Sequence, residues 1–588
     1  MPRRYEALLE PTILPVRPAV ALRTALRRGY HREDLRADLL AGIVVGIVAL
    51  PLSMALAVAS GVAPQHGLYT AIVGGAVIAA LGGSNVQVSG PTAAFVVLLA
   101  PISARFGLGG LVLATLMAGI ILMLMGTLRL GGLIQFVPYP VTTGFTAGIA
   151  VVIATLQLKD FLGLTTGPMP ETWLERVGVL ARALPTVEWD DLAVGAFTLA
   201  VLLLWPRVTR KIPSPLVALG IAGAAAALAT GLVPGFEVAT IQSRFHGIPR
   251  VLPMPGLPWN LPGADGQPLG LSFGLLRDLL PSAFAIAMLG AIESLLSAVV
   301  ADGMTGGSHD PDAELLAQGT GNILAPFFGG IAATGALART ATNVRSGART
   351  PFAGIFHSAF VLLAVLLLAP ALGYLPMASL AALLLLVAWN MSEVKHFAHA
   401  LRVAPKSDVA VLLLCFGLTV IFDMVVSVTV GVVLAALLFM RRMAEVSNVR
   451  LVDQHPLVKG LPRDVLVYEV AGPLFFGAAQ KAMSALQRVP TGISAVLLDL
   501  SSVPAMDATG LVALEGTVER LQKMGIYVIL AGVQMQPMRV LAKSGIHKRR
   551  EQIAVFRSMD RAVAAALERS RTKPDSMAAS SISEGGPP

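Results

Sequence analysis

Two ionisable side chains stand in stretches of the sequence that carry almost no other charge. Glu293 lies in SAFAIAMLGAIESLLSAVV (282–300), and Arg339 lies in TGALARTATNVRSGARTP (334–351). An ionisable group inside a membrane is costly and is usually retained for function. We therefore expect Arg339 to bind an anion. The alternative is a loop cation at the end of a helix.

Glu293 lies about 14 residues into an apolar run, roughly 21 Å along a helix. Burial disfavours a charged carboxylate, which suits a group that takes up and releases a proton. Three interpretations remain open: proton coupling or gating, a structural hydrogen bond to a neighbouring helix, and a sodium site.

Two segments are unsuited to crossing a membrane, and they occupy matching places in the two halves of the chain. In SGPTAAFVVLLAPI (89–102), Pro91 suits a helix start and Pro101 closes the apolar run. The second segment, 334–351, is too polar to face lipid. A helix of this length reaches roughly 15–20 Å, which is only to the middle of a bilayer. Paired short segments of this kind are typical of inverted-repeat transporters that bind substrate between the two half-helix N-termini.

The charge expected between two such N-termini suits a divalent anion, or a monovalent one held more tightly than transport requires. Each N-terminus presents unbonded N–H groups and about half a positive charge. Arg339 adds a full charge, which makes roughly +2. Neutral donors nearby would be the hydroxyls of Ser89, Thr92, Thr340 and Thr342, although Ser89 and Thr342 could instead be helix caps.

The composition requires lipid around much of the chain. Of 588 residues, 55% are apolar and only 13% are charged, and the mean hydropathy is +0.73. A soluble domain carries about 25% charged residues, so an ordinary soluble enzyme is excluded, as are a disordered protein and a secreted disulfide scaffold.

Apolar runs predict an α-helical polytopic membrane protein with 14 segments, arranged as two inverted repeats of seven. Nine full-length segments begin near Leu39, Gly109, Pro140, Asp191, Pro215, Leu279, Phe352, Asp408 and Met424, and five shorter ones begin near Leu68, Pro91, Gly319, Arg339 and Pro376.

The net charge of +9 indicates which loops face the cytoplasm, by the positive-inside rule, rather than nucleic-acid binding. Basic residues follow the sixth, twelfth and fourteenth segments, which predicts that both termini are cytoplasmic. The chain has no phosphate-binding GxxxxGK[ST] motif and no Cys/His cluster with metal spacing, so we expect no cofactor, no metal and no ATP-driven step.

The predicted domains are a cytoplasmic segment (1–38), a transmembrane domain (39–442), a soluble α/β domain (455–570) and a disordered tail (571–588). Strands are expected at 464–470, 494–500 and 526–533, and a helix is expected at 477–486.

Four stretches resemble the SulP anion permeases, the bacterial relatives of solute carrier family 26. The resemblance covers about 30–570. Its motifs are VSGPTAAFVV (88–97), ELLAQGTGNILAPFFGG (314–330), ATGALARTATNVRSGARTP (333–351) and a C-terminal STAS domain with DLSSVPAMDATG (499–510). It implies a multi-pass protein of the bacterial inner (plasma) membrane, core and gate parts, elevator-type movement, a homodimer, and a cytoplasmic regulator of the STAS domain.

The resemblance also implies roles for individual residues. Glu293 matches an acidic position where sodium-coupled relatives tend to have Asp, which favours protons over sodium. In the STAS domain Thr509 matches a phosphorylated position, with a helix N-cap as the alternative. The substrate-binding residues would be Leu52, Ser53, Leu56, Ser89, Gly90, Thr92, Ala338, Arg339 and Thr340.

Stretches such as AMLGAIESLLSAVVADGMTG resemble the four-carbon dicarboxylate transporters of this family. We therefore expect no enzyme but a secondary active transporter that takes up succinate or fumarate with protons. The alternatives are a sulfate or bicarbonate permease or anion exchanger of the same family, and a membrane-anchored anion sensor that signals through its STAS domain.

Overall fold

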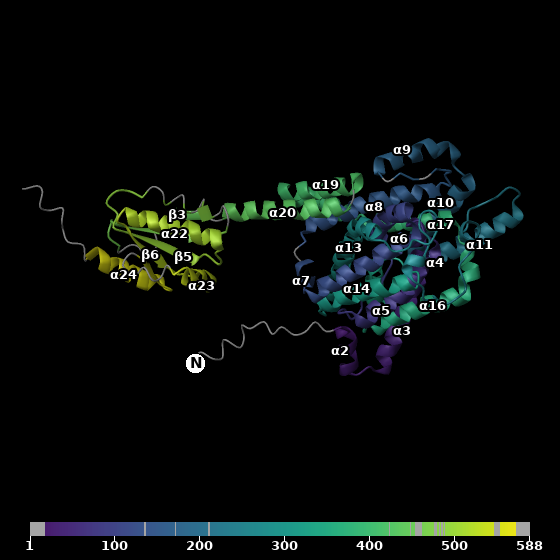
Figure 1. Cartoon of the computed structure of the whole chain (residues 1–588), viewed down its shortest axis with the longest axis horizontal. Coiled ribbons are helices and arrows are strands. Elements are labelled where there is room, and N and C mark those ends of the chain that lie inside the picture. The colour runs from purple at the N-terminus through teal and green to yellow at the C-terminus, as the bar shows by residue number, and fades with distance from the viewer. Residues whose placement is uncertain are drawn as a thin grey trace, which may run out of the picture. The chain divides into compact units, whose positions relative to one another are not determined.

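The computed structural model describes residues 18–571, apart from 135–136, 168, 171, 210–211, 423, 447, 453–460, 476–478, 481–482, 484–485, 487–488 and 546–552. The chain divides into two compact units, Met1–Val433 and Leu434–Pro588 (Figure 1). The helix expected at 477–486 falls largely outside the described residues, and so does the tail from 572 onward.

The first unit is helical, and all 14 predicted segments coincide with helices. Nine helices in the described part of the chain are long and apolar enough to cross a membrane. The helices at the predicted positions are α3 (Arg32–Ala59), α4 (Pro64–Tyr69) continued by the π-helix η1 (Thr70–Gly74) and α5 (Gly75–Leu81), α6 (Ala93–Thr127), α8 (Tyr139–Phe161), α10 (Trp189–Val208), α11 (Ser214–Leu232), α13 (Phe273–Thr305), α14 (Pro311–Phe327), α15 (Leu337–Arg345), α16 (Phe352–Gly373), α17 (Met377–Met391), α19 (Lys406–Ile421) and α20 (Met424–Val446).

Shorter helices lie between these or before them. They are α2 (Val20–Arg28), α7 (Gly131–Ile134), α9 (Trp173–Ala183), the 3-10 helix η2 (Leu184–Thr186), α12 (Ile241–Phe245), the 3-10 helix η3 (Pro258–Asn260) and α18 (Val394–Val403).

The third and fourth predicted segments are joined in α6. The backbone of α6 breaks at Gly107, whose φ of 71° is non-helical and suits glycine. Pro101 was expected to end the first half-helix but lies inside it, so the half-helix continues to the residue before Gly107. A proline within a helix bends it without ending it when neighbouring elements hold both sides.

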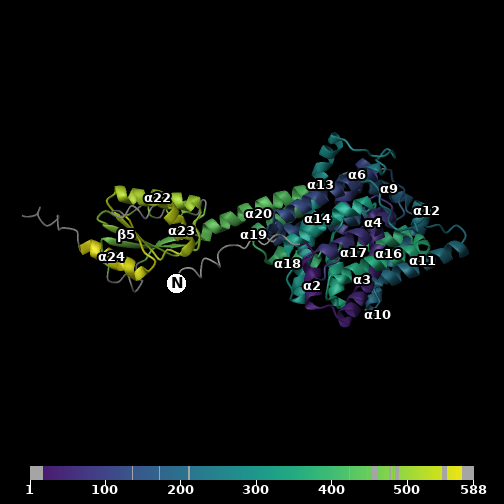
Figure 2. The same ribbon diagram turned by 60° about the horizontal axis from the view of Figure 1, so that its bottom comes forward.

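The membrane helices form two bundles, which confirms the core and gate parts. In the core bundle, α14 and α13 pack on α6, and α16 packs on α3 (Figures 1 and 2). The helix α15 packs on α3 and α13. In the gate bundle, α17 and α19 pack on α8, and α10 packs on α17 and α11. Close helix approach in the core depends on small residues, since a Cβ atom at Gly67 would lie 2.0 Å from the carbonyl oxygen of Ser53.

The second unit is the expected α/β domain. Its five strands follow the order β3-β4-β5-β6-β7, with β3 (Asn448–Leu451) antiparallel to β4 (Val465–Ala471) and the others parallel. The remaining strands are β5 (Ala495–Ser502), β6 (Tyr527–Ala531) and β7 (Ile553–Val555), and the helices described here are α22 (Ala508–Lys523), α23 (Met535–Ser544) and α24 (Met559–Arg571). Apolar residues on both faces of the parallel strands form two buried clusters, as a covered parallel sheet requires.

Candidate functional site

Two very short strands bring the two half-helices together. β1 (Ser89–Gly90) precedes α6, and β2 (Thr334–Gly335) precedes α15. They pair antiparallel, with Ser89 opposite Gly335 and Gly90 opposite Thr334. The antiparallel pairing means that the two repeats approach the site in opposite directions, so the helices that follow present their N-termini to a shared region.

Neither N-terminus has its N–H groups capped by a side chain within the described part of the chain. Thr92 precedes α6 and Ala336 precedes α15, and neither accepts a capping hydrogen bond. The first N–H groups of a helix need partners, and uncapped ones bind anions readily. The two helix starts therefore offer donors and partial positive charge to a ligand.

Arg339, in the first turn of α15, adds a full charge at this junction. Its side chain is buried, with 2% exposed, and Nη2 donates a hydrogen bond to the carbonyl oxygen of Pro91 at the start of the other half-helix. Among the described residues, Nε and Nη1 have no hydrogen-bond partner. Burying a guanidinium whose N–H groups have no acceptor costs free energy, and a bound anion would supply the missing acceptors.

Gly90 makes room for this guanidinium. A Cβ atom at position 90 would lie 2.7 Å from Nη1 of Arg339, closer than non-bonded atoms approach. The first repeat therefore contributes space, and the second contributes the charge that fills it.

Glu293 on α13 lies on the other side of the first half-helix start. Its Oε2 accepts a hydrogen bond of 2.7 Å from the hydroxyl of Thr92, and it is within electrostatic reach of Arg339. Glu293 is partly exposed when the whole residue is considered. The Glu293 carboxylate on α13, the Arg339 guanidinium on α15 and the N-termini of α6 and α15 therefore lie close together.

The remaining residues predicted to bind substrate differ in how far they are exposed. Leu52 and Thr92 are partly exposed and Ala338 is exposed, whereas Ser53 and Leu56 are buried. The Ser53 hydroxyl has no partner among the described residues. The partly exposed residues are positioned to meet a substrate, and the buried ones support them.

Two predicted hydroxyls are already occupied by protein groups. Ser89 accepts a hydrogen bond of 3.0 Å from Nε2 of Gln318. The Thr340 hydroxyl accepts hydrogen bonds of 3.1 Å from the backbone N–H of Val88 and from the hydroxyl of Ser297. Both therefore hold the two short strands in place in this conformation.

The helix-cap interpretation of two hydroxyls is wrong. Ser89 lies in β1, and Thr342 lies inside α15, where its hydroxyl donates to the carbonyl oxygen of Ala338 at 2.8 Å. Thr342 forms this bond within its own turn, as threonine commonly does in a helix interior.

One buried carboxylate near the site, that of Glu314, was not predicted from the sequence. Glu314 on α14 is 1% exposed, and it accepts hydrogen bonds from the backbone N–H groups of Gly83 and Ser84 and from the side chains of Gln87, Gln318 and Ser294. These bonds tie the segment before β1 to α13 and α14. The signal was the spacing of Glu314 and Gln318, four residues apart in a largely apolar segment, which places them on one helix face.

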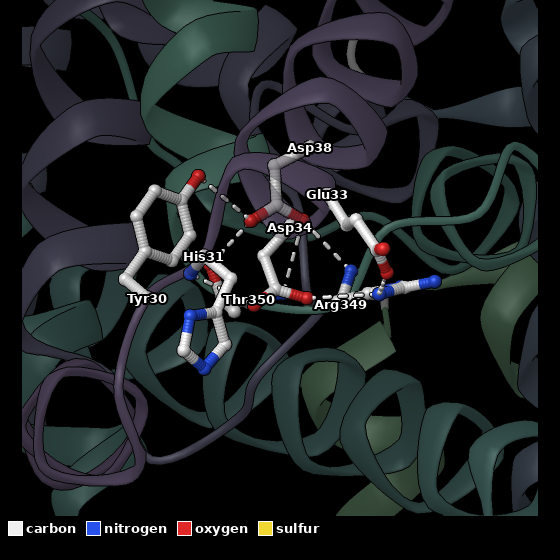
Figure 3. Close-up of polar contacts among 7 residues, drawn as sticks. All are labelled: Tyr30, His31, Glu33, Asp34, Asp38, Arg349 and Thr350. Carbon is white, nitrogen blue, oxygen red and sulfur yellow. Dashed lines mark hydrogen bonds and ion pairs between the residues drawn. The ribbon is translucent and has the colours of Figure 1, made fainter.

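A second acidic cluster, the Asp38 cluster, lies where α3 begins (Figure 3). The buried Asp38 carboxylate accepts hydrogen bonds from the backbone N–H groups of Arg349 and Thr350, from the Thr350 hydroxyl and from Tyr30. Burial and the neighbouring Asp38 raise the pKa of Tyr30 above its ordinary value. The cluster fastens the chain segment just after α15 to the start of α3.

Two hollows lie away from this site. One of about 360 Å³ is lined by residues between α3 and α4, around Gly107 and at 263–264, and another of about 230 Å³ lies beside Phe327 and Phe328. His66 lines both, and none of the predicted site residues does.

Thr509 of the second unit lies in the first turn of α22 and is exposed. The N-cap is Asp507, whose Oδ1 accepts a 2.7 Å hydrogen bond from the N–H of Gly510. The N-cap interpretation of Thr509 is therefore wrong, because the residue two positions earlier performs that role.

Comparison with known proteins agrees with this architecture. The model of the Sulfate permease family matches residues 35–415, and that of the STAS domain matches 456–562. The chain is 40% identical over 492 residues to the Putative sulfate transporter YvdB of Bacillus subtilis, covering 83% of this chain and 90% of the relative. It is 31% identical over 520 residues to the Bicarbonate transporter BicA of Picosynechococcus sp., covering 83% and 87%.

Solved structures share the fold. The murine Solute Carrier 26 family member A9 anion transporter, in the inward-facing state, superimposes with a TM-score of 0.80 at 19% identity, covering 94% of each chain. The transmembrane domain of a cyanobacterial bicarbonate transporter BicA gives a TM-score of 0.58 at 26% identity, covering 69% of this chain and 98% of that one.

Proposed function

Since the chain belongs to the Sulfate permease family and is a multi-pass anion transporter of the membrane, we propose that it takes up divalent anions together with protons, with succinate and fumarate as its first substrates. It is a transporter and not an enzyme, as the names of its relatives state.

The Arg339 guanidinium carries the proposal, because it lies where two uncapped helix starts meet and its Nε and Nη1 have no partner among the described residues. The two helix ends contribute about +1 together and the guanidinium contributes +1, so two negative charges balance the site. While Glu293 is protonated, a monovalent anion would leave the site with excess positive charge.

Glu293 supplies the coupling. While it is ionised, its charge offsets that of Arg339 and lowers the attraction for a dianion. Once it is protonated, the site regains its full positive charge. Dianion binding and proton binding therefore favour each other, as linkage requires. The proton is carried by the Glu293 carboxylate, whose Oε2 accepts a 2.7 Å hydrogen bond from the Thr92 hydroxyl.

The apolar side chain of Leu52 favours a dicarboxylate over an inorganic anion. Leu52 is partly exposed on α3, the helix that packs against α15. The two methylene groups of succinate provide apolar surface for Leu52 to cover, whereas sulfate and bicarbonate have none.

Sulfate is the second candidate, and the similarity to the Putative sulfate transporter YvdB favours it. Sulfate carries the same two charges as succinate, so the charge argument admits both. Bicarbonate, named for the BicA relative, carries one.

The residues of the proposed site belong to the core bundle, on α3, α13 and α15 and in the segment from β1 to the start of α6. A site held within one bundle suits an elevator-type mechanism, in which the core moves against the gate and carries the anion across. The proposal places the protein in the bacterial inner membrane as a homodimer, with both termini cytoplasmic and a cytoplasmic regulator at the STAS domain.

Uptake into proteoliposomes tests the proposal. Labelled succinate, sulfate and bicarbonate are offered separately, with and without an inward proton gradient and with and without sodium. We expect accumulation of succinate that the proton gradient increases and sodium does not. Accumulation of sulfate alone would identify sulfate, rather than succinate, as the substrate. Binding without accumulation of any of the three would favour an anion sensor.

A further inference from the structure

The chain segment from α2 to the start of α3, residues 20–40, forms a surface that the transport site does not use. We call it the α2–α3 hairpin. Five arginines of this hairpin are exposed: Arg23, Arg27, Arg28, Arg32 and Arg36. Within the described part of the chain, no carboxylate lies within salt-bridge distance of any of them.

The nearby acids are engaged elsewhere. Asp34 pairs with Arg349 at 3.0 Å and Glu33 lies 3.9 Å from the same guanidinium, while Asp38 is held in the Asp38 cluster (Figure 3). Among the described residues, the five arginines of the hairpin therefore have no acidic partner.

Exposed leucines accompany the arginines at helical spacing. On α2, Arg23 and Arg27 are four residues apart, and Leu26, 55% exposed, lies beside them. On α3, Leu35 and Leu39 are four residues apart and both are more than 40% exposed. An apolar stripe next to a basic stripe is the pattern of a helix that lies at a membrane interface.

The hairpin is fixed in place at the end of a membrane segment. The N–H of Ala19 donates to the carbonyl oxygen of Leu81 at 2.7 Å, and the N–H of Ala21 donates to that of Gly82 at 3.3 Å. α3 continues from the hairpin into the membrane. Because α3 is long and apolar enough to cross a membrane, we expect the arginines at its start to lie at the level of the lipid headgroups.

We propose that the α2–α3 hairpin binds the headgroups of anionic phospholipids and that this binding supports transport. Arginine recognises the phosphate bidentately, and the leucines enter the adjoining acyl chains. The link to transport is Tyr30, which lies between α2 and α3 and donates to Asp38, which in turn holds residues 349–350 after α15. A headgroup that orders the hairpin thereby steadies the helix that bears Arg339.

The test uses the full chain in vesicles of phosphatidylcholine, with and without phosphatidylglycerol. Two quantities are measured: labelled phosphatidylglycerol retained by the purified protein, and the ratio of initial uptake rates in the two vesicle types. For the wild type we expect retention of phosphatidylglycerol and a faster rate in its presence. The combined change Arg23→Gln and Arg27→Gln should reduce retention at least about fivefold and abolish the rate increase.

Matched variants locate the effect. Lys395→Gln with Arg402→Gln removes two positive charges from α18, a helix whose residues are all at least partly exposed, and should behave as wild type. Arg23→Lys with Arg27→Lys keeps the charge and should retain most of the rate increase. Asp38→Asn should still bind phosphatidylglycerol but lose the rate increase, because it acts between the hairpin and α15.

Three results would overturn the proposal. The first is wild-type retention and rate increase in the Arg23/Arg27 variant. The second is an equal loss in the α18 variant, which would indicate a general surface-charge effect. The third is an equal rate increase when inorganic phosphate is added to phosphatidylcholine vesicles, which would identify a free anion as the ligand.

Discussion

The two half-helices occupy equivalent places in the repeats but contribute different chemistry. The first follows β1, is apolar from Ala93 to Ile102, and ends before the break at Gly107 within α6. The second, α15, has only nine residues and bears Arg339 in its first turn. The first repeat thus supplies a helix start and a space at Gly90, and the second supplies the cation that occupies this space.

Glu293, the acidic residue of the site, also joins the two repeats. Glu293 belongs to α13 of the second repeat but bonds to Thr92 of the first. Both formal charges of the site therefore come from one repeat, and both are held by groups of the other. The site exists only where the repeats meet, and each prediction below separates the contribution of one repeat from that of the other.

The largest effect is expected for Arg339→Ala. It removes the one full positive charge and its hydrogen bond to Pro91, so the affinity for labelled succinate should fall by about 3 kcal/mol or more, roughly 100-fold. The control is Arg345→Ala, which removes an exposed arginine from the other end of the same helix. Equal affinity of the two variants for succinate would show that Arg339 does not bind the substrate.

Glu293→Gln should eliminate the coupling while preserving binding. The amide keeps a hydrogen-bond acceptor for Thr92 but cannot exchange a proton, so an inward proton gradient should no longer increase uptake. Glu237→Gln, at an exposed position, should respond to the gradient as wild type. Uptake by the Glu293 variant that still rises with the gradient would assign coupling elsewhere.

The glycines of the two short strands distinguish the repeats directly. Gly90→Ala meets Nη1 of Arg339 at a backbone φ of 159° that suits glycine, so affinity should fall about tenfold, or about 1.4 kcal/mol, and backbone strain should also lower thermal stability. Gly335→Ala instead meets Gln87 and, at 3.0 Å, the backbone of Ser294.

Because backbone cannot yield as a guanidinium can, Gly335→Ala should lower stability by about 1–3 kcal/mol. Thermal unfolding of the purified variants measures this. Unchanged affinity for succinate in Gly90→Ala would contradict the assignment of space and charge to different repeats.

The smallest effects are expected for the threonines of α15. Thr340→Val leaves the N–H of Val88 without its acceptor, and should reduce stability by about 1–2 kcal/mol. Thr342→Val removes only a bond within its own turn, and should change stability by less than about 0.5 kcal/mol. Thermal unfolding compares them, and equal shifts would show that the contact with Val88 contributes nothing.

Much of this arrangement could be predicted from the sequence because its causes are local. Proline and glycine placement revealed both half-helices, and the scarcity of charge in the membrane region made Arg339 and Glu293 conspicuous. The strands of the STAS domain followed from their apolar runs.

The rest depends on contacts between distant segments. Glu314 acts through backbone groups of Gly83 and Ser84, more than 200 residues away in the sequence. The pairing of β1 with β2, and the use of Ser89 and Thr340 to hold these strands, likewise require both repeats to be folded. Local patterns carry no information about such pairings.

The pH dependence of sulfate binding tests the central claim most directly, because sulfate keeps both charges across the range of interest. Binding to the purified protein is measured from about pH 8 to about pH 6, for the wild type and for Glu293→Gln. Wild-type affinity should rise as the pH falls, because protonation of Glu293 removes the negative charge beside Arg339. The variant should bind tightly and without pH dependence. A variant that follows the same pH curve as the wild type would contradict the account.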